Sequence, residues 1–471
     1  MTSGRLLMPA LHWREGEAFS HEESTIAAAL ELGAGGFVLF GGTDDDVRSL
    51  TKSLRDRAGR PLLIGSDLER GAGQQVRGLA ELPPPLALAS LSEQSVIRGA
   101  GLLTAVEALE VGINWVFAPD ADLDIEPLNP IVQTRSFGED PAKVAECVAS
   151  WVAGCEVGGA LACAKHFPGH GRTRVDSHDT MPVVNASLAE LRTHDLVPFA
   201  AAIDAGVSSI MTAHVAFPAL DPSGTPATRS EPILRMLREE MEFGGLIVSD
   251  ALTMAGALTG GPGAAAIAAV SAGVDVLLDP SDPAAMAAAL DAEATRNGAL
   301  RRRLEASIAR LESVAAAAET DAGDFVASHD SAPALGDWLL SRPLARGIGP
   351  RFSAPLDLVA LDDDLEGKYP PSTRSDILAE ELRKSGVALG PGGSRIVAVF
   401  AEPRASKGRA GLGAKVKEAL RTSLPDARLV IVFGHPRLVN EIPAGPPVLL
   451  AWHRQGLMQA AAARWLRERL S

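Results

Sequence analysis

The residues of this chain with the greatest chemical potential lie in one stretch, 164–182, which reads AKHFPGHGRTRVDSHDTMP. It carries three histidines and two aspartates, namely His166, His170, His178, Asp176 and Asp179. Its proline and glycine residues predict an irregular loop, because proline ends regular structure and glycine relaxes the backbone. A loop that gathers imidazoles and carboxylates points to proton transfer or to metal binding.

The spacing within the loop favours proton transfer. Asp176 and His178 are two residues apart, so the carboxylate can accept the imidazole N–H, fix its tautomer and raise its basicity. This pair predicts a general acid/base dyad, with a solvated loop histidine as the alternative. Zinc bound by His166, His170 and Asp176 is disfavoured, since a Pro/Gly loop lacks the helix that would turn both rings to one side. We therefore expect no metal.

A second reactive group follows in the segment 245–257, GLIVSDALTMAGA. Asp250 ends an apolar run there, so its carboxylate should project beyond a strand, where it could attack an electrophilic carbon. The alternative is an N-cap, because aspartate often begins a helix. A carboxylate nucleophile together with a mobile proton carrier is the equipment for retaining double displacement at an anomeric centre.

These residues need elements to position them, and eight short apolar runs precede residue 280, separated by intervals long enough for helices. The runs are Arg5–Leu11, Gly36–Phe40, Pro61–Asp67, Asn114–Pro119, Ala160–His166, Ser208–His214, Leu246–Asp250 and Val274–Asp279. Continuous apolar runs are typical of parallel strands that are buried on both faces. Eight such strands joined by helices predict an α/β fold, a closed (β/α)8 TIM barrel.

Polar or charged residues end several of these runs. They are Asp67 with Glu69, Asp120 with Asp122, Lys165 with His166, His214, and Asp250. In a barrel, the loops at the carboxyl ends of the strands converge on one mouth, where catalytic groups collect. Each of these residues could instead cap a strand or form a turn. Taken together, they predict that the site lies at this end of the barrel.

The character of the chain changes after the polar segment 319–331. Four further strand-like runs alternate there with helical segments; they are Leu356–Leu361, Arg395–Phe400, Arg428–Phe433 and Pro447–Trp452. This pattern predicts a smaller α/β domain over residues 326–471, after a barrel domain over residues 1–325. Neither a phosphate-binding loop nor a strand-linked dinucleotide fingerprint occurs in the second part.

The amino-acid composition of the chain limits the kinds of partner that it can bind. The chain has 44 Lys and Arg against 59 Asp and Glu, for a net charge of −15, and lacks the basic stripe of a nucleic-acid binder. No uninterrupted apolar stretch reaches the length of a membrane span. Its three cysteines, Cys147, Cys155 and Cys163, favour buried free thiols in a reducing compartment. We expect a cytoplasmic protein that binds neither nucleic acid nor membrane.

Several motifs in the region 60–280 occur together and in order. They are Asp67-Leu-Glu, Asn129-Pro-Ile, Thr134-Arg-Ser-Phe-Gly-Glu-Asp-Pro141, Lys165-His-Phe-Pro-Gly-His-Gly171, Asp176-Ser-His178, Met211-Thr-Ala-His-Val-Ala-Phe-Pro-Ala-Leu-Asp221 and Ser249-Asp250. The set closely resembles glycoside hydrolase family 3, in particular its β-N-acetylglucosaminidase branch, which recycles cell-wall fragments. Residues 326–471 resemble the family's C-terminal α/β sandwich more loosely.

The resemblance implies roles for the reactive residues. Asp250 would be the nucleophile that forms a covalent glycosyl intermediate, and His178 the acid/base that Asp176 orients. The Asp-Ser-His motif separates this branch from family members that use a glutamate of the second domain. The second domain then need not contribute catalytic residues.

The resemblance also implies how sugar would be bound. Lys165, His166 and Arg135 would hydrogen-bond sugar hydroxyls, and Asp67 would accept from hydroxyls at the far edge of the ring. Charged donors paired with a carboxylate suit a polyol, because each hydroxyl both donates and accepts. The family's second sugar-binding arginine maps to Arg77, within a segment that departs from the family pattern. A second departure is Arg172, where the branch commonly has aspartate.

The activity implied is hydrolysis of terminal β-linked N-acetylglucosamine from muropeptides, by a monomer or weak homodimer without a cofactor. Phosphorolysis at the same site is an alternative, because a neutral imidazole does not repel phosphate from the intermediate as a carboxylate would. A β-glucosidase or β-xylosidase of the same family is another alternative. The non-enzymatic alternative is a catalytically silent sugar-binding protein that keeps the barrel.

Overall fold

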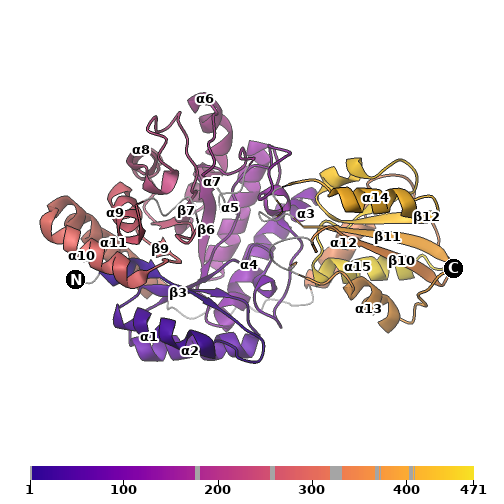
Figure 1. The fold of residues 1–471 in the computed structure, drawn as a ribbon, viewed down its shortest axis with the longest axis horizontal. Coiled ribbons are helices and arrows are strands. Elements are labelled where there is room, and N and C mark those ends of the chain that lie inside the picture. Colours follow the sequence, from indigo (N-terminus) through magenta and orange to yellow (C-terminus); the bar gives the residue numbers. More distant parts are fainter. Residues whose placement is uncertain are drawn as a thin grey trace. The chain divides into compact units, whose positions relative to one another are not determined.

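The computed structural model describes most of the chain. The described residues are 3–174, 181–254, 260–318, 331–365, 371, 373–402, 407 and 409–471. The chain divides into two compact units, and the division is interrupted in sequence: the first comprises Met1–Ala80, Glu93–Ile125 and Ser136–Ala327, the second Glu81–Ser92, Glu126–Arg135 and Ser328–Ser471 (Figure 1). The single boundary expected between residues 325 and 326 stays a prediction.

Parallel strands form the centre of the first unit. They are β1 (Leu7–Met8), β2 (Ala10–His12), β3 (Gly36–Phe40), β4 (Leu63–Ser66), β5 (Trp115–Val116), β6 (Leu161–Phe167), β7 (Ser209–Thr212), β8 (Leu246–Ser249) and β9 (Leu277–Leu278). Strands β2 to β8 pair in chain order. The ring continues because Val248 bridges to Val276 just before β9, and β9 pairs with β1. Strands β1 and β2 are two pieces of one strand separated by Pro9, so the predicted eight-stranded barrel fold is confirmed.

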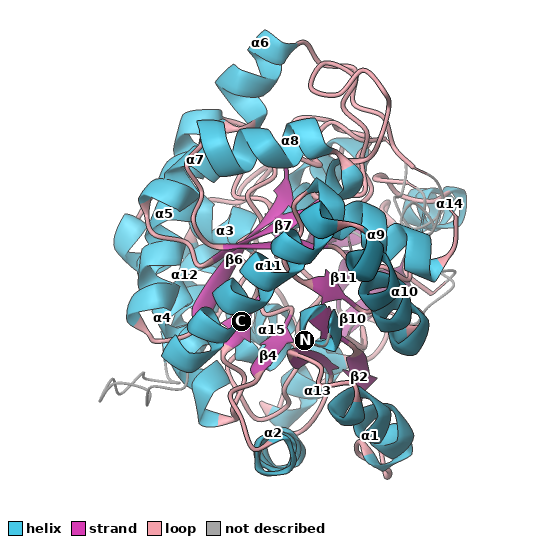
Figure 2. Ribbon diagram, turned by 90° about the vertical axis from the view of Figure 1, so that its left-hand side faces the viewer, coloured by secondary structure: helices cyan, strands magenta, loops and turns pink. Residues whose placement is uncertain are grey.

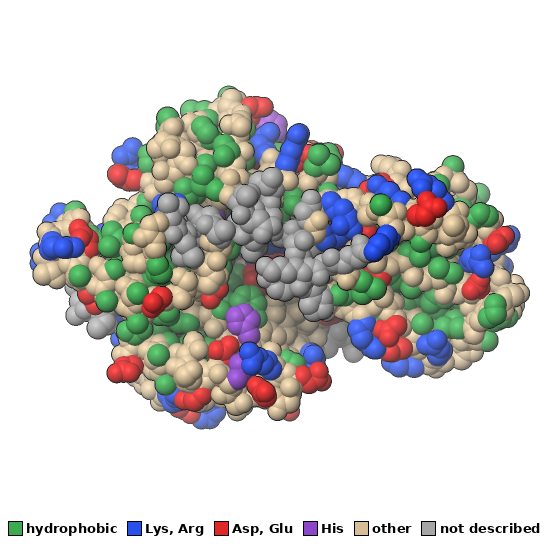
Figure 3. Space-filling view, viewed as in Figure 1, with side chains coloured by type: hydrophobic (Ala, Val, Ile, Leu, Met, Phe, Trp, Pro, Cys, Tyr) green, Lys and Arg blue, Asp and Glu red, His purple; other side chains and the backbone are tan. Residues whose placement is uncertain are grey.

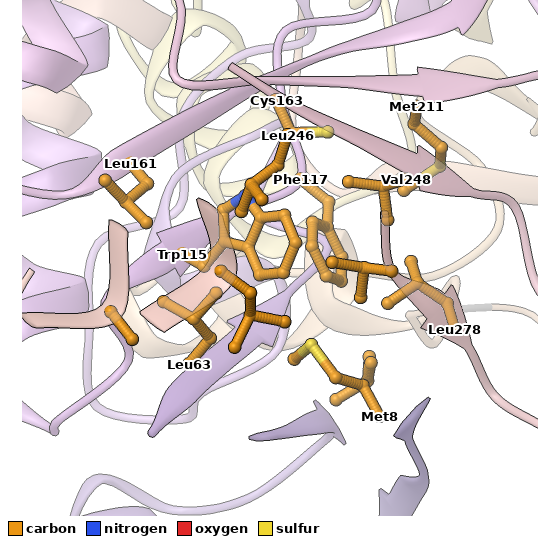
Figure 4. Close-up of a cluster of buried hydrophobic side chains, with 14 of the residues drawn as sticks. Met8, Leu63, Trp115, Phe117, Leu161, Cys163, Met211, Leu246, Val248 and Leu278 are labelled. Atoms are coloured by element: carbon orange, nitrogen blue, oxygen red, sulfur yellow. The ribbon is translucent and has the colours of Figure 1, made fainter. Parts of the chain in front are cut away.

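The barrel interior is a closely packed apolar core. Trp115 and Phe117 meet edge to face, with ring centroids 5.1 Å apart, and Leu63, Met211 and Val248 pack around them (Figure 4). The indole Nε1 of Trp115 donates to Ser209 Oγ at 2.8 Å, so its one polar atom is satisfied. The site must therefore lie at an end of this filled barrel.

Helices cover the outside of the strands (Figure 2). They are α1 (Glu23–Glu31), α2 (Asp44–Ala58), α4 (Gln94–Glu110), α5 (Pro141–Val157), α6 (Leu188–Glu190), α7 (Val197–Asp204), α8 (Glu231–Arg235), α9 (Pro262–Ala272), α10 (Pro283–Arg296) and α11 (Gly298–Ala317). Local sequence sets their ends. Thr43 caps α2 by accepting from the backbone N–H of Asp46, Asp140 caps α5, and Gly59 ends α2 in the left-handed region at φ 60°.

The three cysteines are buried and unpaired, as predicted. Burial raises the pKa of Cys147 to about 11 and that of Cys155 well above its usual value. Thiols with such pKa values stay protonated and behave as small apolar side chains.

A buried carboxylate ties the amino-terminal end of the barrel together. Asp275, which lies just before β9, has a fully buried side chain and contacts three arginines: Arg238 at 2.7 Å, Arg303 at 2.8 Å and Arg310 at 2.9 Å. It also accepts from the backbone N–H of Ile247 at 3.0 Å. Because Arg303 and Arg310 belong to α11, this carboxylate joins the last helix of the barrel to neighbouring strands.

Removal of this carboxylate should destabilise the barrel. We expect Asp275→Ala to lower the free energy of unfolding by about 3–5 kcal/mol, because it leaves three partly buried guanidinium groups without their shared partner. Urea unfolding followed by circular dichroism measures the change. Asp282→Ala is a matched control that removes only the N-cap of α10 and should cost about 1 kcal/mol. Equal losses in the two variants would contradict the role of Asp275.

The second unit contains a parallel sheet in the order β10 (Leu356–Asp362), β11 (Ser394–Ala401), β12 (Ala427–Gly434) and β13 (Val448–Leu450). Its helices are α3 (Pro85–Ser90), α12 (Ser331–Ser341), α13 (Ile377–Lys384), α14 (Ala414–Ser423) and α15 (Gly456–Arg467). At the carboxyl end of the sheet, the fully buried Arg454 contacts Asp362 and Asp364. These carboxylates raise the pKa of Arg454 against the opposing effect of burial.

The second unit also holds segments that precede α4 and α5 in the chain. Gln455 Nε2 donates to the carbonyl of Leu82 at 2.7 Å, and the backbone N–H of Leu457 donates to Glu81 at 3.3 Å. In the part of the chain that the structure describes, no helix is both long and apolar enough to span a bilayer.

Candidate active site

The alternation of side chains along the barrel strands places two predicted site residues at the mouth, the end of the barrel where the strands finish. On β6, Leu161 and Cys163 face the interior core, and Lys165 is the next residue on that face. On β8, Leu246 and Val248 face the core, and Asp250 comes next on that side. Side chains that alternate in this way therefore direct Lys165 and Asp250 into the mouth.

Lys165 is a buried cation held by two carboxylates. Its Nζ lies 2.6 Å from Asp67 Oδ1 and 2.7 Å from Glu69 Oε1, and its side chain is 2% exposed. Charge-assisted hydrogen bonds of this length offset the cost of burying the ammonium group. Asp67 remains 32% exposed, so the pair presents a carboxylate and an ammonium group together, which suits recognition of hydroxyls.

Asp122 organises the loop after β6. Its Oδ2 lies 2.8 Å from His166 Nδ1, and its Oδ1 accepts from the backbone N–H of His170 at 2.6 Å. Burial opposes ionisation of this carboxyl, but the hydrogen bond and charge of His166 prevail and lower the pKa of Asp122. The carboxylate holds the proton on Nδ1 of His166 and thereby fixes the orientation of the imidazole ring. The sequence pattern placed Asp122 among the polar residues expected at the mouth, after the fourth strand-like run, but gave it no individual role.

His170 is part of the scaffold of this loop. Its ring is fully buried, and Nδ1 lies 2.7 Å from Thr173 Oγ1. Burial lowers the pKa of His170 to about 4, against the opposing charge of Asp122. A histidine that stays neutral and hydrogen-bonded within the protein supports the loop rather than exchanging protons with a substrate.

This low pKa predicts a pH dependence of stability. The unfolded chain takes up a proton on His170 near pH 6.5 and the folded chain only near pH 4. Stability is therefore lost as the pH falls through this window, by about 3 kcal/mol from this group. Urea unfolding of the parent protein and of His170→Gln at pH 7 and pH 4 measures the difference. The parent should lose more stability than the variant, and equal losses would contradict the assignment.

Asp250 lies partly exposed at the end of β8. Its Oδ1 accepts from the backbone N–H of the next residue, Ala251, at 2.8 Å. Residues 251–254 form a turn and do not begin a helix. They therefore give no support to the alternative in which Asp250 caps a helix. Beside Asp250, His214 Nε2 lies 3.1 Å from the Ala251 carbonyl and Nδ1 lies 2.9 Å from Thr228 Oγ1. Burial lowers the pKa of His214, against the opposing charge of Asp250.

Cys163 shows that these groups converge on one place. Burial raises the pKa of its thiol to about 12, and the charges of Lys165, Asp67 and Asp250 all act on it. Asp67, Lys165 and Asp250, which stand at the ends of three different strands, are thus all near enough to Cys163 to affect its ionisation.

The remaining predicted site residues lie elsewhere or outside the described part. Asp176 and His178, the predicted dyad, fall among the residues that the structure does not describe. Arg135 ends the short helix η4 (Gln133–Arg135), which belongs to the second unit. Arg77 is exposed, with its guanidinium 4.7 Å from the ring centroid of Trp13. The roles expected for these residues stay predictions.

The carboxylate and imidazole groups at the mouth could also suggest a metal site. Ligand atoms of Asp120, Asp122 and His166 lie within 4.8 Å of one another. Both carboxylate oxygens of Asp122 are already occupied, one by His166 and one by the His170 backbone. These bonds are sufficient to explain the cluster, and the expectation that the protein uses no metal stays a prediction.

At Arg172, where the sequence departs from the family pattern, the side chain pairs within the protein. Its Nε lies 3.1 and 2.9 Å from the two carboxylate oxygens of Asp195. Burial raises the pKa of Asp195, against the opposing effect of Arg172. The departure therefore fastens the loop after β6 to the following helical segment.

A (β/α)8 barrel whose mouth holds a partly exposed carboxylate beside an ammonium–carboxylate pair has the fold and the chemical groups of a barrel enzyme that acts on carbohydrate. The model of the Glycosyl hydrolase family 3 N terminal domain matches residues 16–314. The chain belongs to this family of glycoside hydrolases, as its motifs predicted.

Individual relatives agree with this assignment. A beta-hexosaminidase of Tolumonas auensis is 40% identical over 266 residues, which cover 55% of this chain and 78% of that protein. A beta-N-acetylglucosaminidase/beta-glucosidase of Cellulomonas fimi is 36% identical over 258 residues, 52% of this chain, and the match spans 46% of the Cellulomonas protein's length.

A solved structure resembles the whole chain. It is a glycoside hydrolase family 3 beta-N-acetylglucosaminidase from Paenibacillus sp. str. FPU-7, with a TM-score of 0.82 and 26% sequence identity. The alignment covers 100% of this chain and 96% of that one. Both units of this chain thus have counterparts in a single relative.

Proposed function

We propose that this protein is a retaining β-N-acetylglucosaminidase that releases terminal β-linked N-acetylglucosamine from cell-wall-derived saccharides. The observation that carries the proposal is the placement of Asp250 at the mouth, beyond an interior core that also ends in Lys165 and its partner Asp67. The beta-hexosaminidase name of the Tolumonas relative and the solved Paenibacillus structure support the choice of sugar.

The reaction proceeds by double displacement. Asp250 attacks the anomeric carbon as the glycosidic bond breaks, and His178 gives its proton to the leaving oxygen. Water then attacks the glycosyl ester while His178 takes up the water proton, which frees Asp250 and restores the acid. Asp176 accepts the other imidazole N–H and favours the protonated ring of the first step.

The terminal sugar is recognised by side chains at the mouth that ion pairs and hydrogen bonds already hold in place. Asp67 accepts from ring hydroxyls, while Lys165 and Nε2 of His166 meet neighbouring hydroxyl oxygens. Because Glu69 holds Lys165 and Asp122 holds His166, both side chains are in position before the sugar arrives. Such preorganisation lowers the conformational cost of binding.

Removal of the reacting groups tests the assignment. Asp250→Asn and His178→Ala should each lower kcat/KM on a chromogenic N-acetylglucosaminide, Asp250→Asn by about a thousandfold or more, because a nucleophile carries the covalent step. Thermal unfolding should be unchanged. Asp204→Asn is the matched control, because Asp204 is exposed at the carboxyl end of α7 and thus lies at the end of the barrel opposite the mouth. Full activity of Asp250→Asn would refute the role of Asp250, and an inactive parent protein would favour a silent sugar binder.

The sugar specificity is tested in the same assay. We expect the N-acetylglucosaminide to react faster than the corresponding glucoside, as the beta-hexosaminidase relatives imply. A faster glucoside or xyloside would replace the proposal with the β-glucosidase or β-xylosidase alternative.

Phosphate decides between hydrolysis and phosphorolysis. A neutral histidine acid/base would not repel an incoming phosphate dianion, which keeps phosphorolysis as the second candidate. We expect the turnover rate to be independent of phosphate and free N-acetylglucosamine to be the product. Chromatography of the products with and without phosphate measures both. Formation of a sugar 1-phosphate would show that phosphate, rather than water, attacks the intermediate.

A further inference from the structure

His214 is a buried histidine beside Asp250 that takes no part in the mechanism above. It follows β7, two residues after Thr212. Histidine side chains are visible at the surface of the protein in Figure 3, whereas His214 is 1% exposed. Both nitrogen atoms of its ring contact other parts of the protein. A ring engaged in this way does not exchange protons with a substrate, so it can act on the reaction only through its neighbours.

The partners of His214 decide which nitrogen carries the proton. Nε2 lies 3.1 Å from the carbonyl oxygen of Ala251, and because a carbonyl can only accept, Nε2 is the donor. In the neutral ring Nδ1 is then an acceptor, and the hydroxyl of Thr228, on the short helix η6 (Ala227–Arg229), donates to it at 2.9 Å. Thr228 in turn accepts from Thr212 Oγ1 at 2.9 Å. Burial lowers the pKa of His214, which keeps the ring neutral at neutral pH.

The Ala251 carbonyl belongs to a peptide group that is held at both of its ends. The same peptide group contains the N–H of Leu252, which donates to the carbonyl of Leu278 at 2.9 Å. His214 follows β7 and Leu278 ends β9, so the two contacts come from the strands on either side of β8. Because a peptide group is planar and rigid, these two hydrogen bonds fix its orientation.

This peptide group lies next to the carboxylate of Asp250 in the chain and influences its direction. Asp250 Oδ1 accepts from the backbone N–H of Ala251 at 2.8 Å. Only two rotatable backbone bonds separate that N–H from the Ala251 carbonyl. A displacement of the carbonyl therefore passes to the carboxylate. Attack on carbon is sensitive to such a displacement, since a misplacement of about 1 Å can lower the rate about a hundredfold.

We propose that His214 is a positioning residue for the nucleophile, which orients Asp250 by holding the carbonyl of Ala251. This inference rests on the proposed function, in which Asp250 attacks the anomeric carbon. A neutral imidazole suits this task because it holds the backbone without placing a cation beside the nucleophile. A cation there would stabilise the carboxylate before it reacts and would raise the barrier to attack.

Two amide substitutions separate the two hydrogen bonds of His214. Glutamine brings an amide N–H near the place of Nε2 and can still donate to Ala251, whereas the shorter asparagine reaches only the place of Nδ1 beside Thr228. We expect His214→Asn to lower kcat on a chromogenic N-acetylglucosaminide about a hundredfold and to leave KM within about twofold, because sugar contacts with Asp67 and Lys165 persist. His214→Gln should keep kcat within about fivefold of the parent value.

Asn114→Ala is the matched control. Asn114 is also buried and binds the backbone beside a neighbouring strand, since it accepts from the N–H of Ile64 at 2.8 Å and donates to the carbonyl of Leu62 at 3.0 Å. It lies just before β5, at the end of the barrel opposite the mouth. The control should unfold at a lower temperature and keep the kcat of the parent. A loss of kcat in the control as large as in His214→Asn would contradict the role of His214.

Thr228→Val tests the inference with the imidazole in place. It removes the hydroxyl that donates to Nδ1 and preserves the shape of the side chain. We expect kcat to fall about tenfold, which corresponds to the loss of about one hydrogen bond. This variant carries the kinetic test if His214→Asn does not fold, and an unchanged kcat would then overturn the inference.

A parent-like kcat in His214→Asn, or a loss in His214→Gln as large as in His214→Asn, would also overturn it. Hydrogen exchange followed by mass spectrometry tests the hold on the turn without turnover. We expect the amides of Ala251 and Leu252 to exchange faster in His214→Asn and Thr228→Val than in the parent, and equal exchange would overturn the inference. Absence of turnover by the parent protein would count against the proposed function, and the exchange measurement would still decide whether His214 holds the turn.

Discussion

The mouth of this barrel depends on one buried charge. Lys165 stands at the end of β6 with almost no contact with solvent, and an unpaired ammonium group in that position would be too costly to keep. Asp67 and Glu69 supply the compensation at 2.6 and 2.7 Å. Because both carboxylates follow β4, the ion pairs fasten the loop after one strand to the end of another. The position of the Asp67 carboxylate at the mouth is therefore a consequence of charge compensation.

The same constraint shapes the adjoining loop. Asp122, also fully buried, accepts from the ring of His166 and from the backbone of His170. Lys165 and Asp122 are thus each matched by a partner from another strand or loop. Under the proposed function, a sugar would meet side chains whose geometry is already fixed, and a rigid scaffold of this kind supports recognition of a polyol.

Much of this architecture could be predicted because its causes are local. All eight barrel strands appear in the sequence as continuous apolar runs, because strands that are buried on both faces have no solvent-facing side for polar residues. Asp67, Lys165 and Asp250 were found by their places at strand ends. The partners Asp122 and Asp275 were not assigned roles, because their meaning comes from His166 and from three distant arginines. Nothing local showed that residues 81–92 and 126–135 pack with the second unit, since that depends on long-range contacts such as Gln455 with Leu82.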